Sequence, residues 1–191
     1  KKYFVTWQIL NPELIDPLTN LKVIQNEKIS VFVIGWSQWS TKIFEALIKI
    51  LPDLQDLNFQ VVLGEKNMHF KEEFKKFPNV LSHDFLTQKR LGNILKNTDI
   101  AITRWWATSL WELNVFGIHS IIIPLTWSAW NHQNKNATYF NEEFWSDILD
   151  ENNNLEVDLF RKLQKYKWFR KSWLNLEGFF KSLQIIETEI K

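Results

Sequence analysis

Three polar segments of the chain carry residue types that bind phosphate and hydroxyl groups. Residues 35–40 read Gly-Trp-Ser-Gln-Trp-Ser, residues 103–112 end in the carboxylate of Glu112, and residues 124–137 gather amides, hydroxyls and a histidine. Hydroxyls and backbone N–H groups at a helix start bind an anion such as a diphosphate. A carboxylate accepts hydrogen bonds from a ribose diol, and amides suit sugar hydroxyls. Together the three segments indicate a phosphorylated sugar ligand.

Each segment taken alone has a plainer explanation as the start of a helix. Ser40 suits the N-cap of the helix that follows it. Glu112 is expected in the first turn of its helix, where Ser109 and Glu112 have the spacing of a capping box. Residues 124–137 suit a polar helix start exposed to solvent. The plainer explanation is favoured for any one segment, so a ligand is indicated only if all three meet at one edge of one sheet.

Alternating apolar and amphipathic runs predict the elements that position these segments. Among the apolar runs, residues 31–35 and 120–124 are continuous enough for strands buried on both faces. Pro52 is expected to end the first amphipathic helix, and Gly117 suits the C-cap of a later one. Strands are predicted at residues 1–6, 31–35, 59–64, 80–81, 99–103 and 120–124, and helices at residues 40–51, 91–95, 109–116, 133–144, 156–166 and 174–189.

This alternation predicts a doubly wound parallel α/β sheet of the Rossmann-like class, with helices on both faces. Residues 1–191 are expected to form a single domain, because no linker, repeat or low-complexity tract interrupts them. The chain begins directly in a predicted strand, which indicates that sequence is missing upstream. Ligands of such sheets bind beyond the carboxyl ends of the strands, at the switch in strand order. All three polar segments follow predicted strands and are therefore expected at that edge.

The composition is that of an ordinary globular protein and argues against several kinds of partner. The net charge is +1 and basic residues are interspersed with acidic ones, so nucleic acid is not expected as a partner. Cysteine is absent, which fits a reducing compartment, and no apolar run approaches the ~18 residues of a membrane span. No metal is expected, because no Asp-x-Asp motif occurs and His69, His83, His119 and His132 show no ligand spacing.

The three segments resemble motifs of the MurG-like glycosyltransferases, glycosyltransferase family 28. Those enzymes carry a Gly-Gly-Ser-Gln-Gly-Ala/Ser turn, a Gly-Ala-x-Thr/Ser-x-x-Glu segment and an Asn-His-Gln-x-x-Asn-Ala segment, in this order. Here residues 35–40, 106–112 and 131–137 stand in their places, and the resemblance covers nearly the whole chain. It implies the nucleotide-sugar-binding C-terminal half of a two-domain GT-B enzyme, whose N-terminal acceptor domain is absent from this chain.

The resemblance implies a site for the donor UDP-N-acetylglucosamine, with no metal or other cofactor. Ser37 would contact the diphosphate, Glu112 the ribose, the backbone of Leu86 the uracil, and Gln133 the N-acetylglucosamine hydroxyls. The catalytic residues are unknown, because they would lie in the absent domain. The resemblance also places these residues against the donor: Gln38, Ala107, Thr108, Ser109, Leu110, Trp111, His132 and Asn136.

The implied enzyme is a hexosyltransferase that moves N-acetylglucosamine to a lipid-linked muramoyl-pentapeptide, a step in peptidoglycan precursor synthesis. It would be cytoplasmic and peripheral at the inner face of the plasma membrane, where its acceptor lies. The chain alone is expected to be inactive without its N-terminal domain or subunit. Residues 174–191 are expected to form a final helix that returns towards that domain. Residues 6–12 lack the Arg with which the family often holds phosphate near the domain junction.

Tryptophan occurs 11 times and glycine only 5 times, the reverse of the usual excess of glycine. Trp36, Trp39 and Trp106 stand where the family has glycine, which such loops need for close backbone approach to phosphate. We favour the hypothesis that UGA codons, read as glycine in the source lineage, were translated as tryptophan. The alternative is an aromatic, inactive pocket with little affinity for UDP-sugars.

Other functions stay open on the sequence. Another two-domain or two-subunit UDP-sugar transferase, such as a diacylglycerol galactosyltransferase, would share the same overall plan. A non-catalytic, degenerate binding module is favoured by the loop tryptophans and by the missing Arg. Residues 165–173 are rich in Lys, Arg, Trp and Phe and are expected to connect to the final helix, with contact to a membrane surface as the alternative.

Overall fold

The computed structural model describes residues 11–15, 27–35, 40–104, 107–125 and 146–169. The elements predicted at residues 1–6, 133–144 and 174–189 lie outside the described residues, so those predictions stand as they were made. Nine of the 11 tryptophans also lie outside them, and only Trp111 and Trp168 are described.

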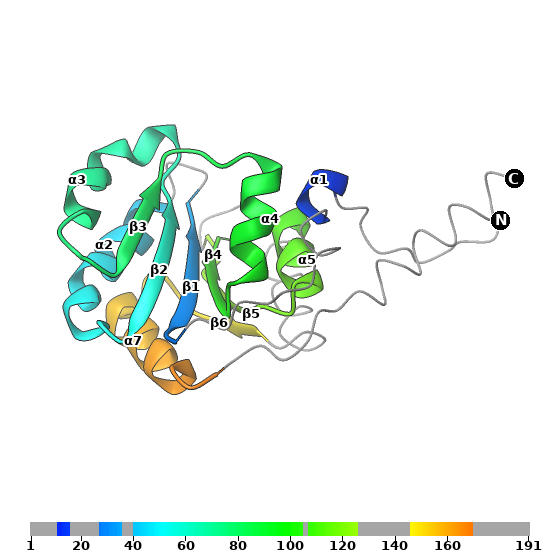
Figure 1. The fold of residues 1–191 in the computed structure, drawn as a ribbon. Helices are drawn as coiled ribbons and strands as arrows, with labels where there is room; N and C mark the ends of the chain where they lie inside the picture. The colour runs from blue at the N-terminus through cyan, green and yellow to red at the C-terminus, as the bar shows by residue number, and fades with distance from the viewer. Residues whose placement is uncertain (1–10, 16–26, 36–39, 105–106, 126–145, 170–191) are drawn as a thin grey trace, which may run out of the picture.

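Six strands form one sheet in the order β3-β2-β1-β4-β5-β6, and every neighbouring pair is parallel (Figure 1). The central strand β1 pairs with β2 on one side and with β4 on the other. This order confirms the predicted doubly wound, Rossmann-like α/β class. The strands are β1 Ile29–Ile34, β2 Leu57–Val62, β3 Val80–His83, β4 Ile100–Thr103, β5 His119–Ile122 and β6 Ser146–Ile148.

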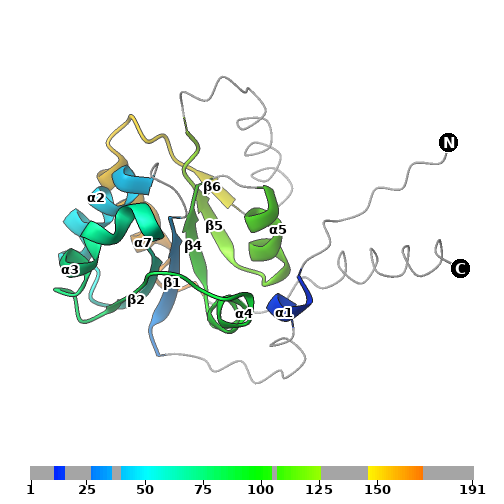
Figure 2. The same ribbon diagram turned by 90° about the horizontal axis from the view of Figure 1, so that it is seen from above.

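Helices cover both faces of the sheet (Figure 1; Figure 2). α2, α3 and α7 lie on one face, and α1, α4 and α5 lie on the other. No helix in the described part of the chain is both long and apolar enough to cross a membrane. The helices are α1 Pro12–Ile15, α2 Thr41–Ile50, α3 Lys71–Phe74, α4 Gln88–Lys96, α5 Ala107–Val115 and α7 Leu155–Tyr166, with 3-10 turns η3 Leu51–Asp53 and η4 Glu65–Phe70.

Two hydrophobic cores result, one on each face, and β1 contributes to both. Ile29, Val31 and Val33 are buried on the face of α2 and α7, whereas Phe32 and Ile34 are buried on the face of α4 and α5. A strand that is buried on both faces has no polar alternation, which is why the sequence shows a continuous apolar run. Each such side chain contributes about 1.5–3 kcal/mol relative to exposure, so β1 anchors the two layers.

The sequence patterns miss β6 and the segment from η4 to α3. β6 consists of Ser-Asp-Ile, which is too short to show apolar alternation. The η4–α3 segment depends on tertiary packing: Phe70 and Phe74 pack edge-on against Phe44, with ring centroids 5.5 and 5.7 Å apart. Contacts with an aromatic side chain on another helix leave no periodic signal in the local sequence.

Local chemistry sets the ends of two predicted helices. α2 ends at Ile50, just before Pro52, as predicted; Pro52 itself lies in the first turn of η3, where its missing N–H costs no bond. Gly117 ends α5 as predicted, with a φ of 65°. Its N–H donates to Asn114 at 2.9 Å, and the Ile118 N–H donates to Leu113 at 3.0 Å. These are the two backbone bonds of a Schellman cap.

Candidate functional site

The strand order reverses between β1 and β4, and this switch opens at the carboxyl edge of the sheet. β1 leads to α2 on one face and β4 leads to α5 on the other, so their loops diverge from adjacent strands (Figure 2). The last residues of β1, β4 and β5 lie side by side in register. The loops that begin at Gly35, Arg104 and Ile123 therefore leave one edge, where open α/β sheets bind their ligands.

The first loop begins at Gly35, where a larger residue would not fit. A Cβ at this position would lie 2.2 Å from Cζ of Phe44 and 2.9 Å from Cβ of Ser40. Phe44 is fully buried between Phe70 and Phe74, so it has no free space into which to move. The missing side chain lets α2 pack directly over the end of β1, which directs the N-terminus of α2 towards the carboxyl edge.

Ser40 occupies the N-cap position of α2, as expected, but its side chain makes no capping hydrogen bond. The residue is buried, and its Oγ has no hydrogen-bond partner among the described residues. The first N–H groups of any helix also lack intrahelical partners. An unbonded hydroxyl beside them adds a donor at a position where a helix already favours an anion.

Asn67, which the sequence patterns did not single out, holds the ends of β1 and β2 together. Its Nδ2 donates to the carbonyl of Leu63 at 2.9 Å and lies 3.5 Å from the carbonyl of Gly35. The Gly35 N–H donates in turn to the carbonyl of Val62 at 3.0 Å. Asn67 is 1% exposed, so it supports the start of the first loop from the protein interior and is not accessible to a ligand.

A buried ion pair links the second loop to the loop after β6. Nη1 of Arg104 lies 2.6 Å from Oε2 of Glu151, and the two side chains are only 5% and 3% exposed. The same Nη1 donates to the carbonyl of Ile123, where the third loop begins, at 3.3 Å. Arg104 therefore connects three loops at the carboxyl edge. Sequence reasoning missed it, because Glu151 lies in a stretch that the sequence shows only as a polar turn.

Electrostatics make this pair interdependent. Burial lowers the pKa of Arg104, and the hydrogen bond and charge of Glu151 oppose that shift. A charged group taken out of water costs several kcal/mol unless a partner compensates it. Each member of the pair therefore needs the other in order to stay charged inside the protein.

Glu112 lies deeper in its helix than expected. α5 begins at Ala107, so Glu112 is the sixth helical residue and not part of the first turn. Ser109 is the third residue of α5 and cannot be its N-cap, so the capping-box explanation of Ser109 and Glu112 is wrong. The helix starts two residues earlier than predicted, since Ala107 and Thr108 already have helical backbone. A capping role therefore does not account for the carboxylate of Glu112 in this segment.

The Glu112 carboxyl group is half-buried and makes no hydrogen bond or ion pair with the described residues. Burial raises its pKa from 4.5 to about 7. A buried carboxylate without donors is unfavourable for the fold, so a ligand that supplies hydroxyl donors would be stabilised there. Among the predicted binding residues, Glu112 has the environment most typical of a functional group.

The other predicted binding residues divide into three groups. Leu86 follows β3 with its side chain buried and its backbone groups without a hydrogen bond to any described residue, which leaves them available to a base. On α5, Leu110 packs in the core, so only its backbone could meet a ligand, while Ser109 and Trp111 are partly exposed. Ala107 and Thr108 are described only as helix, and Ser37, Gln38, His132, Gln133 and Asn136 lie outside the described residues.

No group of three or more His, Cys, Asp or Glu residues is arranged to hold a metal ion in the part of the chain that the structure describes. The polar groups that have no partner among the described residues include the Ser40 hydroxyl, the backbone groups of Leu86 and the Glu112 carboxyl group. These groups suit a ligand that combines an anion with hydroxyls.

Comparisons with known proteins identify relatives of this chain. A UDP-N-acetylglucosamine–N-acetylmuramyl-(pentapeptide) pyrophosphoryl-undecaprenol N-acetylglucosamine transferase of Campylobacter jejuni subsp. doylei is 28% identical over 165 residues, covering 85% of this chain and 46% of that protein. The enzyme of the same name from Sulfurihydrogenibium is 23% identical over 151 residues, covering 79% of this chain and 42% of its own length. The chain thus spans less than half the length of these relatives.

Among solved structures, the crystal structure of Acinetobacter baumannii MurG superposes with a TM-score of 0.64 at 16% identity. The match covers 80% of this chain and 44% of that one, and it supports the GT-B type of fold. Residues 30–175 match the glycosyltransferase family 28 C-terminal domain, which is most of the chain. The match includes β1 from its second residue, the other five strands of the sheet, and helices α2, α3, α4, α5 and α7. The chain belongs to the family of glycosyltransferase family 28 C-terminal domains.

Proposed function

We propose that this chain is the donor-binding domain of a transferase that moves N-acetylglucosamine from UDP-N-acetylglucosamine to a lipid-linked muramoyl-pentapeptide. The observation that carries the proposal is Glu112, whose carboxyl group has a raised pKa and no partner among the described residues, in the helix that follows β4 at the switch point of a family 28 sheet. The names of the relatives supply the donor and the acceptor. The complete enzyme would act from the cytoplasm, peripheral at the inner face of the plasma membrane.

The donor would lie across the carboxyl edge in an extended form. Its diphosphate would meet Ser37, Gln38 and the start of α2, where Ser40 adds a hydroxyl. The ribose diol would donate to Glu112, and the uracil would bond to the backbone of Leu86. On the other side of the switch, α5 would line the nucleotide through Ala107, Thr108, Ser109, Leu110 and Trp111, and the sugar would meet His132, Gln133 and Asn136.

Transfer requires an acceptor hydroxyl to attack the anomeric carbon as UDP departs. This chain would stabilise the departing diphosphate through the N–H dipoles at the start of α2. The base that takes the proton from the acceptor would come from the N-terminal domain or subunit. We therefore expect this chain to bind UDP-sugar only weakly by itself, without a metal or other cofactor, and to show no transfer alone.

Calorimetric titration of the chain with UDP-N-acetylglucosamine, UDP-galactose and UDP tests the proposal. Glu112→Gln should weaken the binding of all three nucleotides about tenfold, because a neutral amide accepts less strongly from the ribose diol. Glu72→Gln is the matched control, since Glu72 is exposed on α3 and its ion pair with Lys75 is worth little. Equal affinity of Glu112→Gln and the parent chain would contradict the proposed ribose contact.

The titration also separates the alternatives. A preference for UDP-galactose would favour a different UDP-sugar transferase, and no nucleotide binding by any form of the chain would favour a degenerate module. A separately encoded N-terminal partner would favour the two-subunit form.

The effect of the loop tryptophans is tested by comparing the chain as printed with a variant that carries glycine at the three loop positions. The chain with Trp36, Trp39 and Trp106 should bind UDP-sugars weakly, because indoles stand where the family brings its backbone close to phosphate. The triple variant Trp36→Gly, Trp39→Gly, Trp106→Gly should bind in the micromolar range. Micromolar affinity of the tryptophan form would contradict this expectation. UGG codons at all three positions would rule out recoding of UGA.

A further inference from the structure

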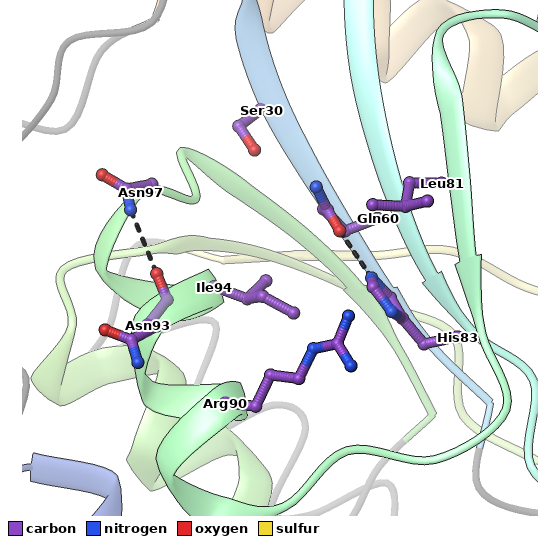
Figure 3. Close-up of a pocket in the computed structure, with 8 residues that line it drawn as sticks. All are labelled: Ser30, Gln60, Leu81, His83, Arg90, Asn93, Ile94 and Asn97. Carbon is purple, nitrogen blue, oxygen red and sulfur yellow. Dashed lines mark hydrogen bonds between the residues drawn. The ribbon is translucent and has the colours of Figure 1, made fainter.

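A cavity lies between α4 and the sheet and extends from the amino ends of the strands to His83, the last residue of β3. It has a volume of about 400 Å³ and is lined by residues of α4 and of β1, β2 and β3 (Figure 3). Ser30, the second residue of β1, and Asn97, at the end of α4, mark its amino-side limit. Its size is within the range of small-molecule sites. The complete lining is Ser30, Gln60, Leu81, His83, Arg90, Asn93, Ile94 and Asn97.

The lining is polar on a sheet face that would ordinarily be apolar. On the opposite face, β2 buries Leu57, Phe59 and Val61 in the core. On the face of α4, the same strand presents Gln60 to the cavity, and β3 presents His83. Core packing does not explain these polar residues, because doubly wound sheets are usually covered by apolar contacts on both faces.

The polar groups of the cavity converge from several elements. Nε2 of His83 lies 2.6 Å from Oε1 of Gln60, which fixes both side chains on the sheet. Figure 3 shows the guanidinium of Arg90 directed from α4 towards this pair. At the other end, Nδ2 of Asn97 donates to the carbonyl of Asn93 at 3.0 Å, and the buried Oδ1 of Asn97 has no hydrogen-bond partner among the described residues.

The side chains that line the cavity carry a net positive charge. Arg90 is its one charged lining residue, and no acidic side chain is among the eight. Asp84, the nearest acid along the chain to His83, pairs with Lys71 at 2.8 Å. Arg90 makes no ion pair with a described residue. A guanidinium presents a planar fork of donors that matches the oxygens of a carboxylate or phosphate.

We propose that this cavity binds a small hydroxylated oxyanion, with Arg90 on the anionic group and Gln60, Asn93 and Asn97 on the hydroxyls. The site is separate from the donor site and does not depend on the function proposed for it. Because Arg90 is largely exposed, the affinity is expected in the millimolar range, as for a site that responds to abundant metabolites.

Protonation of His83 should strengthen this binding. Burial and the charge of Arg90 lower the pKa of His83, and Asp84 partly opposes them. A bound anion offsets both the burial and the positive charge, so it favours the protonated imidazole. Affinity should therefore rise as the pH falls through the range below 6.5, the ordinary pKa of histidine.

Titration of the whole chain by NMR, with the His83 ring signals as the reporter, tests the proposal. The probes are sulfate, which keeps its charge across this pH range, and glycerol 3-phosphate, which adds hydroxyls. Both should shift the His83 signals, and glycerol 3-phosphate should bind more tightly than sulfate. Arg90→Gln should weaken both about tenfold. Lys89→Gln is the matched control, because it removes the same charge from a neighbouring exposed position of α4 outside the lining.

Three outcomes would overturn the proposal: no shift of His83 with either anion, equal weakening by Lys89→Gln and Arg90→Gln, or displacement of the anions by UDP. The last result would assign the cavity to the donor site. If the donor proposal fails, binding of the two anions at His83 is still expected, so the two failures can be told apart.

Discussion

Two partly buried carboxyl groups of this protein have opposite surroundings. Asp147 in β6 accepts hydrogen bonds from Tyr166 at 2.7 Å and His119 at 3.0 Å, and it also pairs with Lys162. Glu112 in α5 has no such partner among the described residues. Burial opposes the charge of Asp147, but the three donors hold its pKa below 3.8, whereas burial alone raises the pKa of Glu112 to about 7.

The surroundings of the two carboxyl groups indicate a structural role for Asp147 and a ligand-binding role for Glu112. The partners of Asp147 come from β5 and α7, so its charge fastens a helix to the edge of the sheet. Glu112 lies in α5, the helix that follows β4, and its charge is unfavourable for the fold unless a donor outside the described residues bonds to it. A fold tolerates such a group when the missing donors arrive with a ligand. Glu151, buried in an ion pair with Arg104, is an intermediate case.

The largest effect on stability is expected when the ion pair between Arg104 and Glu151 is broken. Glu151→Gln removes the carboxylate that pairs with the buried Arg104 guanidinium, which should lower the free energy of unfolding by about 3–5 kcal/mol. Urea unfolding at pH 7 measures the loss. The double variant Arg104→Met, Glu151→Leu removes both charges and should recover most of the stability. An unchanged midpoint for Glu151→Gln would show that water already compensates the pair.

Asp147→Asn should lower the free energy of unfolding by about 1–3 kcal/mol, because an amide still accepts hydrogen bonds but cannot pair with Lys162. The pKa of Asp147 is lower in the folded state, so its contribution is present above pH 3.8 and disappears as the pH falls through the folded pKa. The variant should therefore show a weaker loss of stability in acid. Urea midpoints measured from pH 2 to pH 6 provide the check.

Glu112→Gln should have the opposite sign and stabilise the ligand-free fold by about 1 kcal/mol at pH 8, after allowance for solvent screening. The folded pKa of Glu112 is raised, so the stability of the parent chain is full below pH 4.5 and is reduced as the pH rises through about 7. The variant should lack this decline between pH 4.5 and 8. Thermal denaturation of both proteins over that pH range provides the check. If Glu112→Gln is less stable than the parent chain, the two carboxyl groups do not differ in the way described.

The smallest effect is a change in proton binding. Hydroxyl donors on Glu112 favour its charged form, so UDP binding at pH 7 should release roughly half a proton per ligand. Calorimetry in two buffers of different ionisation enthalpy measures this release. Glu112→Gln should abolish it, and uptake of protons by the parent chain would be the contrary result.

The sequence predicts the layers of this fold well, because its strands are buried on both faces and its helices have one apolar face. β1, β4 and β5 and helices α2, α5 and α7 all lie where the apolar periods place them, within two residues at most ends. The location of the site follows from the same pattern, since each predicted segment comes after a strand. Gly117 was predictable as a cap because its role is local.

The parts that could not be predicted depend on distant partners. Glu151 lies in a polar stretch, and nothing local shows that it is buried against Arg104. Asn67 is one polar residue among several, and only the fold brings it to the carbonyl of Gly35. The early start of α5 also has no apolar signal, because Ala107 and Thr108 precede the periodic residues. Ion pairs and amide contacts of this kind require a known topology.

The central position of β1 also constrains how the protein is made. The N–H of Ser30 donates to Oδ2 of Asp99 at 2.9 Å across 69 positions of the chain, and β4 follows directly. A nascent chain that has not yet emerged as far as β4 can pair β1 only with β2, which leaves an unpaired apolar strand edge exposed on the ribosome. The interval between the synthesis of β1 and that of β4 is thus the one in which this strand edge is open to incorrect pairing.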